Sequence, residues 1–197
     1  FRAFRRTVRA QAFPIGIDVD EFKALTHAEE AMDMYHRMRE EYARRRLLLG
    51  IDRLDYSKGL PHRLQAFRQL LARYPENHRR APRSRRPPPP RAPAAAPADL
   101  RDGMNLVAKE YIAAQDPVDP GVLVLSRFAG AAEQLKDALL VNPYDTHGTA
   151  ETIQQALQMP LEERQRRHQL LLNNIRTFDV HWWRRTYLEA LAETVPD

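Results

Sequence analysis

Hydrophobic residues along this chain follow two spacings, one typical of strands and one typical of amphipathic helices. Residues 8–13 have the character of a short strand, and residues 47–51 form a compact apolar run, as expected of a buried parallel strand. Between residues 22 and 38, and again between residues 60 and 71, apolar side chains recur every three or four positions, as on one face of a helix. Asp18 is placed to cap the first of these helices.

The same two spacings return in the second half of the chain and alternate there. This order of strands and helices predicts an α/β fold, in which helices cover a parallel sheet. The polar loop at residues 52–59 then follows a strand, at the edge where ligands bind in open α/β sheets. The expected elements are helices at residues 104–114, 148–159, 161–175 and 181–193, and strands at residues 122–125 and 138–141.

Residues 77–98 differ in composition from the sequence on either side. Nearly all of this segment, HRRAPRSRRPPPPRAPAAAPA, lacks large apolar side chains, so we expect it to be disordered or polyproline-like. A linker is one interpretation. We favour a frameshift, because arginine, proline and alanine dominate when a GC-rich gene is read out of frame, and because both edges of the segment are abrupt.

Composition narrows the class of protein. With 43% hydrophobic residues the chain can build a core, and the absence of cysteine excludes disulfides and thiolate metal sites. Neither a signal peptide nor an apolar run of membrane-spanning length is present, so we expect a cytoplasmic protein without membrane attachment. A net charge of +5 offers nucleic-acid binding as an alternative, but the largest arginine cluster, at residues 79–91, lies in a proline-rich stretch without interleaved aromatic residues, and we do not expect it.

Two basic residues of different shape lie in the loop after the strand predicted at residues 47–51. The guanidinium of Arg53 can bind two oxygens at once, and the ammonium of Lys58 acts as a point charge. Together they suit a diphosphate. Taken alone, such a pair is weak support, because charged loop residues are usually solvated surface features.

A second group of polar residues lies at the start of the helix predicted near residue 104. Gly103, after Asp102, lets a ligand approach the backbone closely, and N–H groups at a helix start favour an anion. Glu110 lies two turns into that helix, where its carboxylate could accept hydrogen bonds from vicinal hydroxyls such as those of a ribose. The alternative without a ligand is that Asp102 and Gly103 form only a turn and a helix cap, and that Glu110 is a charged surface residue.

Three strings of residues, in this order, resemble one family of enzymes. They are IGID at residues 15–18, RLDYSKG at residues 53–59 and DGMNLVAKEY at residues 102–111. Near-identical strings occur in the retaining glycosyltransferases of trehalose-6-phosphate synthase type. The resemblance covers nearly everything outside residues 77–98 and continues through residues 120–126, 128–131 and 140–143.

The resemblance implies a glycosyltransferase of the GT-B type, of which this chain would supply the Rossmann-like C-terminal domain that binds the donor nucleotide, in incomplete form. It implies glucosyl transfer from UDP-glucose to glucose-6-phosphate with retention of configuration, giving trehalose-6-phosphate and UDP. It is compatible with a homo-oligomer. It implies no metal and no cofactor, since UDP-glucose counts as a substrate and not as a cofactor.

The resemblance also assigns roles to individual residues. Arg53 and Lys58 would contact the UDP phosphates, Asp102 would approach the transferred glucose, and Glu110 would bind the ribose; the first three carry the catalytic assignment. Catalysis would come from stabilising the charge that builds on the departing UDP. The residues expected at the donor are Arg53, Lys58, Asp102, Gly103, Met104, Asn105, Leu106, Val107, Ala108, Lys109 and Glu110.

The chain departs from the family pattern in two respects. We expect the amino-terminal domain, which supplies most of the glucose-6-phosphate site, to be absent, and the interval between Lys58 and Asp102 is too short for a complete sheet. This chain alone is therefore predicted to be inactive, with a non-catalytic UDP-binding module as the alternative function. The predicted division is residues 1–18, a remnant of the amino-terminal domain and crossover; residues 19–76, the first part of the donor-binding domain; residues 77–98, the foreign segment; and residues 99–197, the remainder with the C-terminal helices.

Other candidate sites receive ordinary structural interpretations. The histidines show no metal-binding spacing. Trp183, Tyr187 and Leu191 recur at helical spacing, which favours a packed helix face over a platform for stacking sugars. The basic run at residues 164–167 is interpreted as a solvated helix face.

Overall fold

The computed structural model describes residues 2–3, 6–7, 10–42, 46–51, 58–78, 94–95 and 102–193. Short strands pair in twos within these residues, and the pairs that join the core are parallel, which confirms the predicted α/β fold. The strands are β1 (Arg2–Ala3) antiparallel to β2 (Arg6–Thr7), β3 (Leu48–Leu49) parallel to β4 (Ala94–Ala95), and β5 (Val124–Ser126) parallel to β6 (Leu139–Val141).

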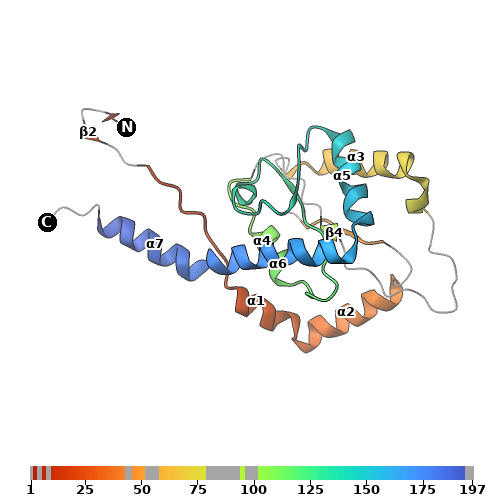
Figure 1. Cartoon of the computed structure of the whole chain (residues 1–197), viewed down its shortest axis with the longest axis horizontal. Coiled ribbons are helices and arrows are strands. Elements are labelled where there is room, and N and C mark those ends of the chain that lie inside the picture. Colours follow the sequence, from red (N-terminus) through yellow and green to blue (C-terminus); the bar gives the residue numbers. More distant parts are fainter. Residues whose placement is uncertain are drawn as a thin grey trace.

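Helices lie on both sides of the strands. Helices α3 and α5 pack against each other on one side, and α4 packs against α1 and α6 on the other (Figure 1). The helices are α1 (Val19–Thr26), α2 (Glu29–Glu41), α3 (Leu60–Arg73), α4 (Leu106–Ala113), α5 (Thr146–Gln158), α6 (Leu161–Thr177) and α7 (Val180–Ala192), with short 3₁₀ turns η2 (Pro75–His78) and η3 (Gly130–Glu133).

Strand β5 is buried on both faces, because alternate residues of a strand point to opposite sides. Leu125 is fully buried and packs with Ile112 of α4 and Ile175 of α6. Its neighbour Val124 packs in a separate cluster with Ala156 of α5. A sheet covered on both faces explains why the sequence shows compact apolar runs rather than alternation at its strands.

Two predicted elements differ from the structure in extent. Residues 10–13, the described part of the first predicted strand, belong to no strand. The helix predicted between residues 22 and 38 is divided, since α1 ends at Thr26 and α2 begins at Glu29. Ala28 between them takes an extended backbone (φ −63°, ψ 144°), which ends the helical hydrogen-bond ladder without a proline or glycine to mark the break. The cap is confirmed, because Asp18 accepts hydrogen bonds from the first turn of α1.

Helix α3 forms where predicted, but its buried face differs from the predicted apolar stripe. Leu64 and Phe67 are 67% and 38% exposed, whereas Ala66 and Leu70 are each 1% exposed. The face toward α5 is partly polar, since Gln69 donates to Thr146 Oγ1 at 2.9 Å. Contact with α5 therefore selects a different face from the one that hydrophobicity alone indicates.

The interpretation of residues 164–167 as a solvated face is wrong at Arg164. This side chain is 7% exposed, donates to Pro120 O, and lies 2.7 Å from Asp119 Oδ1. A guanidinium can be buried when its donors are matched by a carboxylate and a carbonyl. Arg164 therefore ties α6 to the loop before β5.

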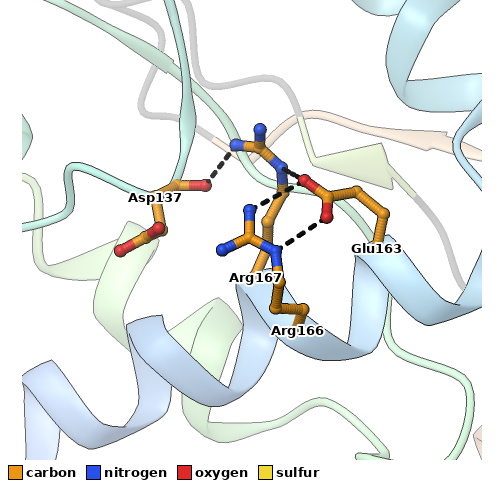
Figure 2. Close-up of polar contacts among 4 residues, drawn as sticks. All are labelled: Asp137, Glu163, Arg166 and Arg167. Atoms are coloured by element: carbon orange, nitrogen blue, oxygen red, sulfur yellow. Dashed lines mark hydrogen bonds and ion pairs between the residues drawn. The ribbon is translucent and has the colours of Figure 1, made fainter.

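A second ionic group lies on the same stretch of α6, around Glu163, as Figure 2 shows. Glu163 accepts hydrogen bonds from Arg166 and Arg167, and Arg167 also donates to Asp137 O at 2.8 Å. The hydrogen bond from Arg166 is the main cause that lowers the pKa of Glu163 to about 2. Arg166 is half-exposed, so the basic run at residues 164–167 does lie at the surface at this residue, as predicted.

Replacing Arg164 with alanine is expected to cost about 2–3 kcal/mol of unfolding free energy, because Asp119 and the Pro120 carbonyl both lose a charged donor. Arg166→Ala is the matched control, and it should cost much less unfolding free energy because the Arg166 pair is exposed. Urea denaturation of the variants measures both values. Equal costs would contradict the assignment of Arg164 to the interior.

The packed face predicted for α7 is present only in part, because Tyr187 and Leu191 are 43% and 50% exposed and no described residue of α7 is buried. The rings of Trp183 and Tyr187 stack at 5.8 Å, and Trp183 Nε1 donates to Phe13 O at 3.1 Å. The Phe13 ring meets Tyr187 edge-on at 5.3 Å. This part of the amino-terminal segment therefore runs beside α7 where that helix extends from the body of the molecule (Figure 1).

Most of the foreign segment at residues 77–98 lies outside the described residues. Its ends do not, because residues 77–78 belong to η2 and residues 94–95 form β4. Its predicted disorder, the frameshift and the four-part division of the chain stay predictions. Among the described residues, no helix is long and apolar enough to cross a membrane.

Candidate functional site

The candidate site is built around an ion pair between two residues that the sequence singles out. Lys58 Nζ lies 2.5 Å from Asp102 Oδ2, although 44 positions separate the residues in the chain. Both side chains are largely buried, with 13% and 19% of their surface exposed. Lys58 precedes Gly59, whose left-handed backbone (φ 62°) turns the chain into α3. The structure thus brings the second and third resembling strings together.

The negative charge of Asp102 is stabilised by its surroundings. Burial by itself raises the pKa of the carboxyl, but the Lys58 ammonium and the backbone N–H groups of Met104 and Asn105 outweigh it, so the pKa of Asp102 lies below its ordinary value. Met104 N donates to Asp102 Oδ1 at 3.0 Å. Asp102 is therefore an anion at neutral pH, and its bond with Lys58 is charge-assisted.

The turn that carries Asp102 is fixed by the backbone of the loop after β5. Gly130 N donates to Asp102 O at 2.8 Å, and Ala131 N donates to Met104 O at 2.8 Å. A Cβ atom on Gly130 would lie 2.1 Å from Gly103 O, so this close approach requires glycine. A Cβ atom on Gly103 would meet nothing within 4 Å. One side of the turn is therefore packed, and the other is open.

Helix α4 begins at Leu106, whereas the sequence predicted that Asp102-Gly103 opens it. The N-cap is Asn105, which has a left-handed backbone (φ 66°) and whose Oδ1 accepts from Ala108 N at 3.1 Å. Asparagine tolerates this conformation better than most residues. Asn105 is 6% exposed, so its side chain stabilises the turn. The N–H groups of the first turn of α4 favour an anion.

Residues 106–110, predicted to line the nucleotide, separate into two faces of α4. Leu106, Val107 and Glu110 are half-buried and lie together, since positions 106 and 110 are one turn apart. Ala108 and Lys109 are 1% and 3% exposed. The first three can meet a ligand that lies along the helix, Leu106 only with the part of its side chain that is not packed against the core. The side chains of the other two face the core, so these residues could meet a ligand only through their backbone, and their place in the lining stays a prediction.

The remaining predicted residues divide between the open side and the undescribed part of the chain. Gly103 and Met104 are both exposed, Met104 at 54%, on the open side of the turn. Arg53 lies outside the described residues, and its contact with a diphosphate stays a prediction.

An aromatic group that was not predicted from the sequence lies beside the ion pair. Phe128 follows β5, Tyr144 follows β6, and their ring centroids lie 6.0 Å apart. The His62 ring, in the first turn of α3, lies 5.6 Å from that of Tyr144. Phe128 O accepts from Asp102 N at 3.5 Å, which places the group next to the site. A signal was available, because both aromatic residues follow predicted strands, at the edge where ligands bind.

Other parts of the described chain offer weaker candidates. No group of three or more His, Cys, Asp or Glu side chains in the described ranges could hold a metal ion. A hollow of about 450 Å³ lies beside α5 and the start of α6, lined by Tyr74, Gln154, Gln158 and Glu163 among others. None of the described site residues lines this hollow, so it is separate from the Lys58–Asp102 pair.

Comparison with known families identifies the sequence pattern. The family model Glycosyltransferase family 20 matches residues 1–81 and 94–193, which leaves out only the centre of the foreign segment and the last residues. The trehalose-6-phosphate synthase of Cronobacter sakazakii is 36% identical over 246 residues, covering 100% of this chain and 52% of the relative. That of Sinorhizobium fredii is 38% identical, covering 96% of this chain and 52% of the relative. The chain thus spans about half the length of these relatives.

Solved structures give the same result for the fold. A trehalose-6-phosphate protein from E. coli bound with UDP-2-fluoro glucose superposes with a TM-score of 0.87 at 32% identity, covering 98% of this chain and 54% of that one. A UDP-forming α,α-trehalose-phosphate synthase from Burkholderia xenovorans in complex with glucose-6-phosphate superposes with a TM-score of 0.86 at 36% identity, covering 97% and 53%. These similarities confirm the fold expected from the resembling strings, that of one half of a GT-B glycosyltransferase.

Proposed function

Because the chain belongs to glycosyltransferase family 20, we propose that it carries the donor-binding part of an enzyme that transfers glucose from UDP-glucose to glucose-6-phosphate. The products are trehalose-6-phosphate and UDP. The main support for the proposal is the ion pair between Lys58 and Asp102. Asp102 lies three residues before Asn105, the N-cap of α4. This arrangement combines a cation, an anion and a helix start at the ends of parallel strands, where a nucleotide sugar can bind.

The two ends of a nucleotide sugar need different partners, and the geometry offers both. The ammonium of Lys58 suits the diphosphate, and the open side of Gly103 leaves room for the transferred sugar. The stripe of Leu106, Val107 and Glu110 leads away from this point along α4, and its carboxylate suits the hydroxyls of a ribose. Two similar solved structures, of other proteins, hold a UDP-glucose analogue and glucose-6-phosphate.

The reaction then needs no nucleophile from this chain. As the bond between the sugar and UDP breaks, negative charge grows on the departing phosphate, and a positioned cation stabilises it more than it stabilises the bound substrate. Lys58 is suited to this because its geometry is set by Asp102 before a ligand arrives. Arg53 is the second cation of the proposal.

The protein is tested by incubation with UDP-glucose and glucose-6-phosphate, with UDP release followed by a coupled assay and the sugar product by NMR. UDP that forms only when both sugars are present supports the complete proposal. The matched control is the double variant Arg53→Ala, Lys58→Ala, which should form none. If the wild-type protein neither turns over nor binds UDP, the proposal is wrong.

A non-catalytic UDP-binding module is the second candidate function. It is favoured by the span of the chain, about half of its relatives, and by the family match, which omits residues 82–93. This candidate predicts measurable UDP binding without UDP release from the two sugars. The same double variant should abolish that binding, so unchanged affinity would exclude it.

A further inference from the structure

Lys109 is a buried lysine on the core side of α4, and the proposed chemistry does not use it. Its side chain is 3% exposed, and Nζ donates to Ile15 O and to Gln134 Oε1, both at 2.7 Å. Neither acceptor is charged. Burial lowers the pKa of Lys109 to about 8, which shows that the ammonium loses hydration that its partners only partly replace. A methionine of similar length would fill the same space without that cost.

The two acceptors of Lys109 belong to segments that frame the donor site. Gln134 directly follows η3, whose first residues Gly130 and Ala131 hold the turn that begins at Asp102. The ammonium thus connects α4 to the loop against which the start of α4 is packed.

The second acceptor lies on the segment that leads into α1. Ile15 precedes Gly16, where a Cβ atom would lie 2.2 Å from the backbone carbon of Asp179, so the segment passes directly over the junction of α6 and α7. Val180 N donates to Ile17 O at 3.2 Å at the same crossing. Residues 15–17 are therefore fixed to the C-terminal helices, and Lys109 fixes α4 to them.

We propose that Lys109 is a positioning residue for the donor. By bonding to the segment at residue 15 and to Gln134, it fixes both the position of α4 along its axis and its rotation about that axis. In that position Leu106, Val107 and Glu110 face the ligand while Lys109 itself touches none of it. The inference rests on the proposed function. A buried amine with two directed acceptors fixes position more narrowly than an apolar side chain, which can slide along its neighbours.

The test compares the dissociation constant for UDP, measured by calorimetry, in three single variants of the whole chain. Lys109→Met is expected to raise the dissociation constant about 10- to 100-fold, since an error of about 1 Å in a binding group has effects of this size. Gln134→Leu removes one of the two acceptors and should give a smaller increase. Lys136→Met, the same change at a 60% exposed lysine nearby, should leave the value unchanged.

Thermal unfolding of each variant separates positioning from a purely structural role. If Lys109→Met lowers the unfolding temperature but its folded fraction binds UDP as the wild type does, the proposal is overturned. If Lys109→Met does not fold, Gln134→Leu decides, because unchanged affinity in that variant overturns the proposal as well. A wild-type chain that fails to bind UDP overturns the proposed function, and this inference with it; a wild type that binds while both variants bind equally well overturns this inference alone.

Discussion

Replacing Gly130 with alanine should destabilise the protein by about 3 kcal/mol, the upper end of the cost of forcing extra atoms into a packed region. The added Cβ atom would lie 2.1 Å from Gly103 O, which is backbone and cannot rotate away. Relief requires the two turns to separate, and this weakens the hydrogen bonds from Gly130 N to Asp102 O and from Ala131 N to Met104 O. Urea denaturation monitored by circular dichroism measures the loss.

Gly103→Ala is the matched control for this prediction. The same atom added at Gly103 would meet nothing within 4 Å, so stability should change by less than about 0.5 kcal/mol. Equal destabilisation by the two substitutions would show that the turns are not packed as described. This variant also tests ligand binding. The open space at Gly103 is the proposed place of the sugar, so UDP-glucose should bind to Gly103→Ala less tightly than UDP does.

Replacing Lys58 with methionine should weaken UDP binding by about 100-fold. Loss of a charged hydrogen-bond donor costs about 1.5–3 kcal/mol, and about 1.4 kcal/mol corresponds to a factor of ten in affinity. The value should lie in the upper part of this range, because the Asp102 carboxylate would remain at the site without its cation and would repel the diphosphate. Isothermal titration with UDP measures the change.

The control for Lys58 is the exposed Lys136, and Lys136→Met should bind UDP as the wild type does. A second variant, Lys58→Met with Asp102→Asn, removes both charges and should recover part of the lost affinity. If Lys58→Met binds UDP normally, the ion pair is a structural link and plays no part in donor binding.

The order of elements could be predicted from the sequence because each depends on local chemistry. Compact apolar runs indicated β3, β5 and β6, and helical spacing with caps and prolines indicated α3, α5 and α6. The Lys58–Asp102 contact was not predicted, because the sequence indicates a strand before Lys58 but none directly before Asp102.

The differences arise where distant parts of the chain decide the outcome. Arg164 lies in a run that is polar in sequence, but the carbonyl of Pro120 and the carboxylate of Asp119 offer it partners in the interior. Lys109 is buried for the same kind of reason, since Ile15 O and Gln134 Oε1 reach it from segments far along the chain. No periodicity contains this information, because the acceptors are set by tertiary packing.

Asn105 shows a local version of the same limit. The sequence placed the helix start at Asp102-Gly103, where glycine and a capping carboxylate suggest it. In the structure the N-cap is Asn105, which has a left-handed backbone. The hydrogen bond from Ala131 N to Met104 O fixes Met104 in the turn before the helix, so α4 begins only at Leu106. The shift leaves Gly103 exposed on the open side of the site, where the proposal needs it.

A crystal structure of this chain grown with UDP would show directly whether the nucleotide binds at the Lys58–Asp102 pair. We expect a diphosphate oxygen within hydrogen-bond distance of Lys58 Nζ, about 2.7–3.2 Å, and the ribose along the Leu106–Glu110 face of α4. UDP bound elsewhere, for example in the hollow beside α5 and lined by Gln154, would contradict it. So would a complex in which the Lys58–Asp102 pair is unchanged and the nucleotide makes no contact with α4.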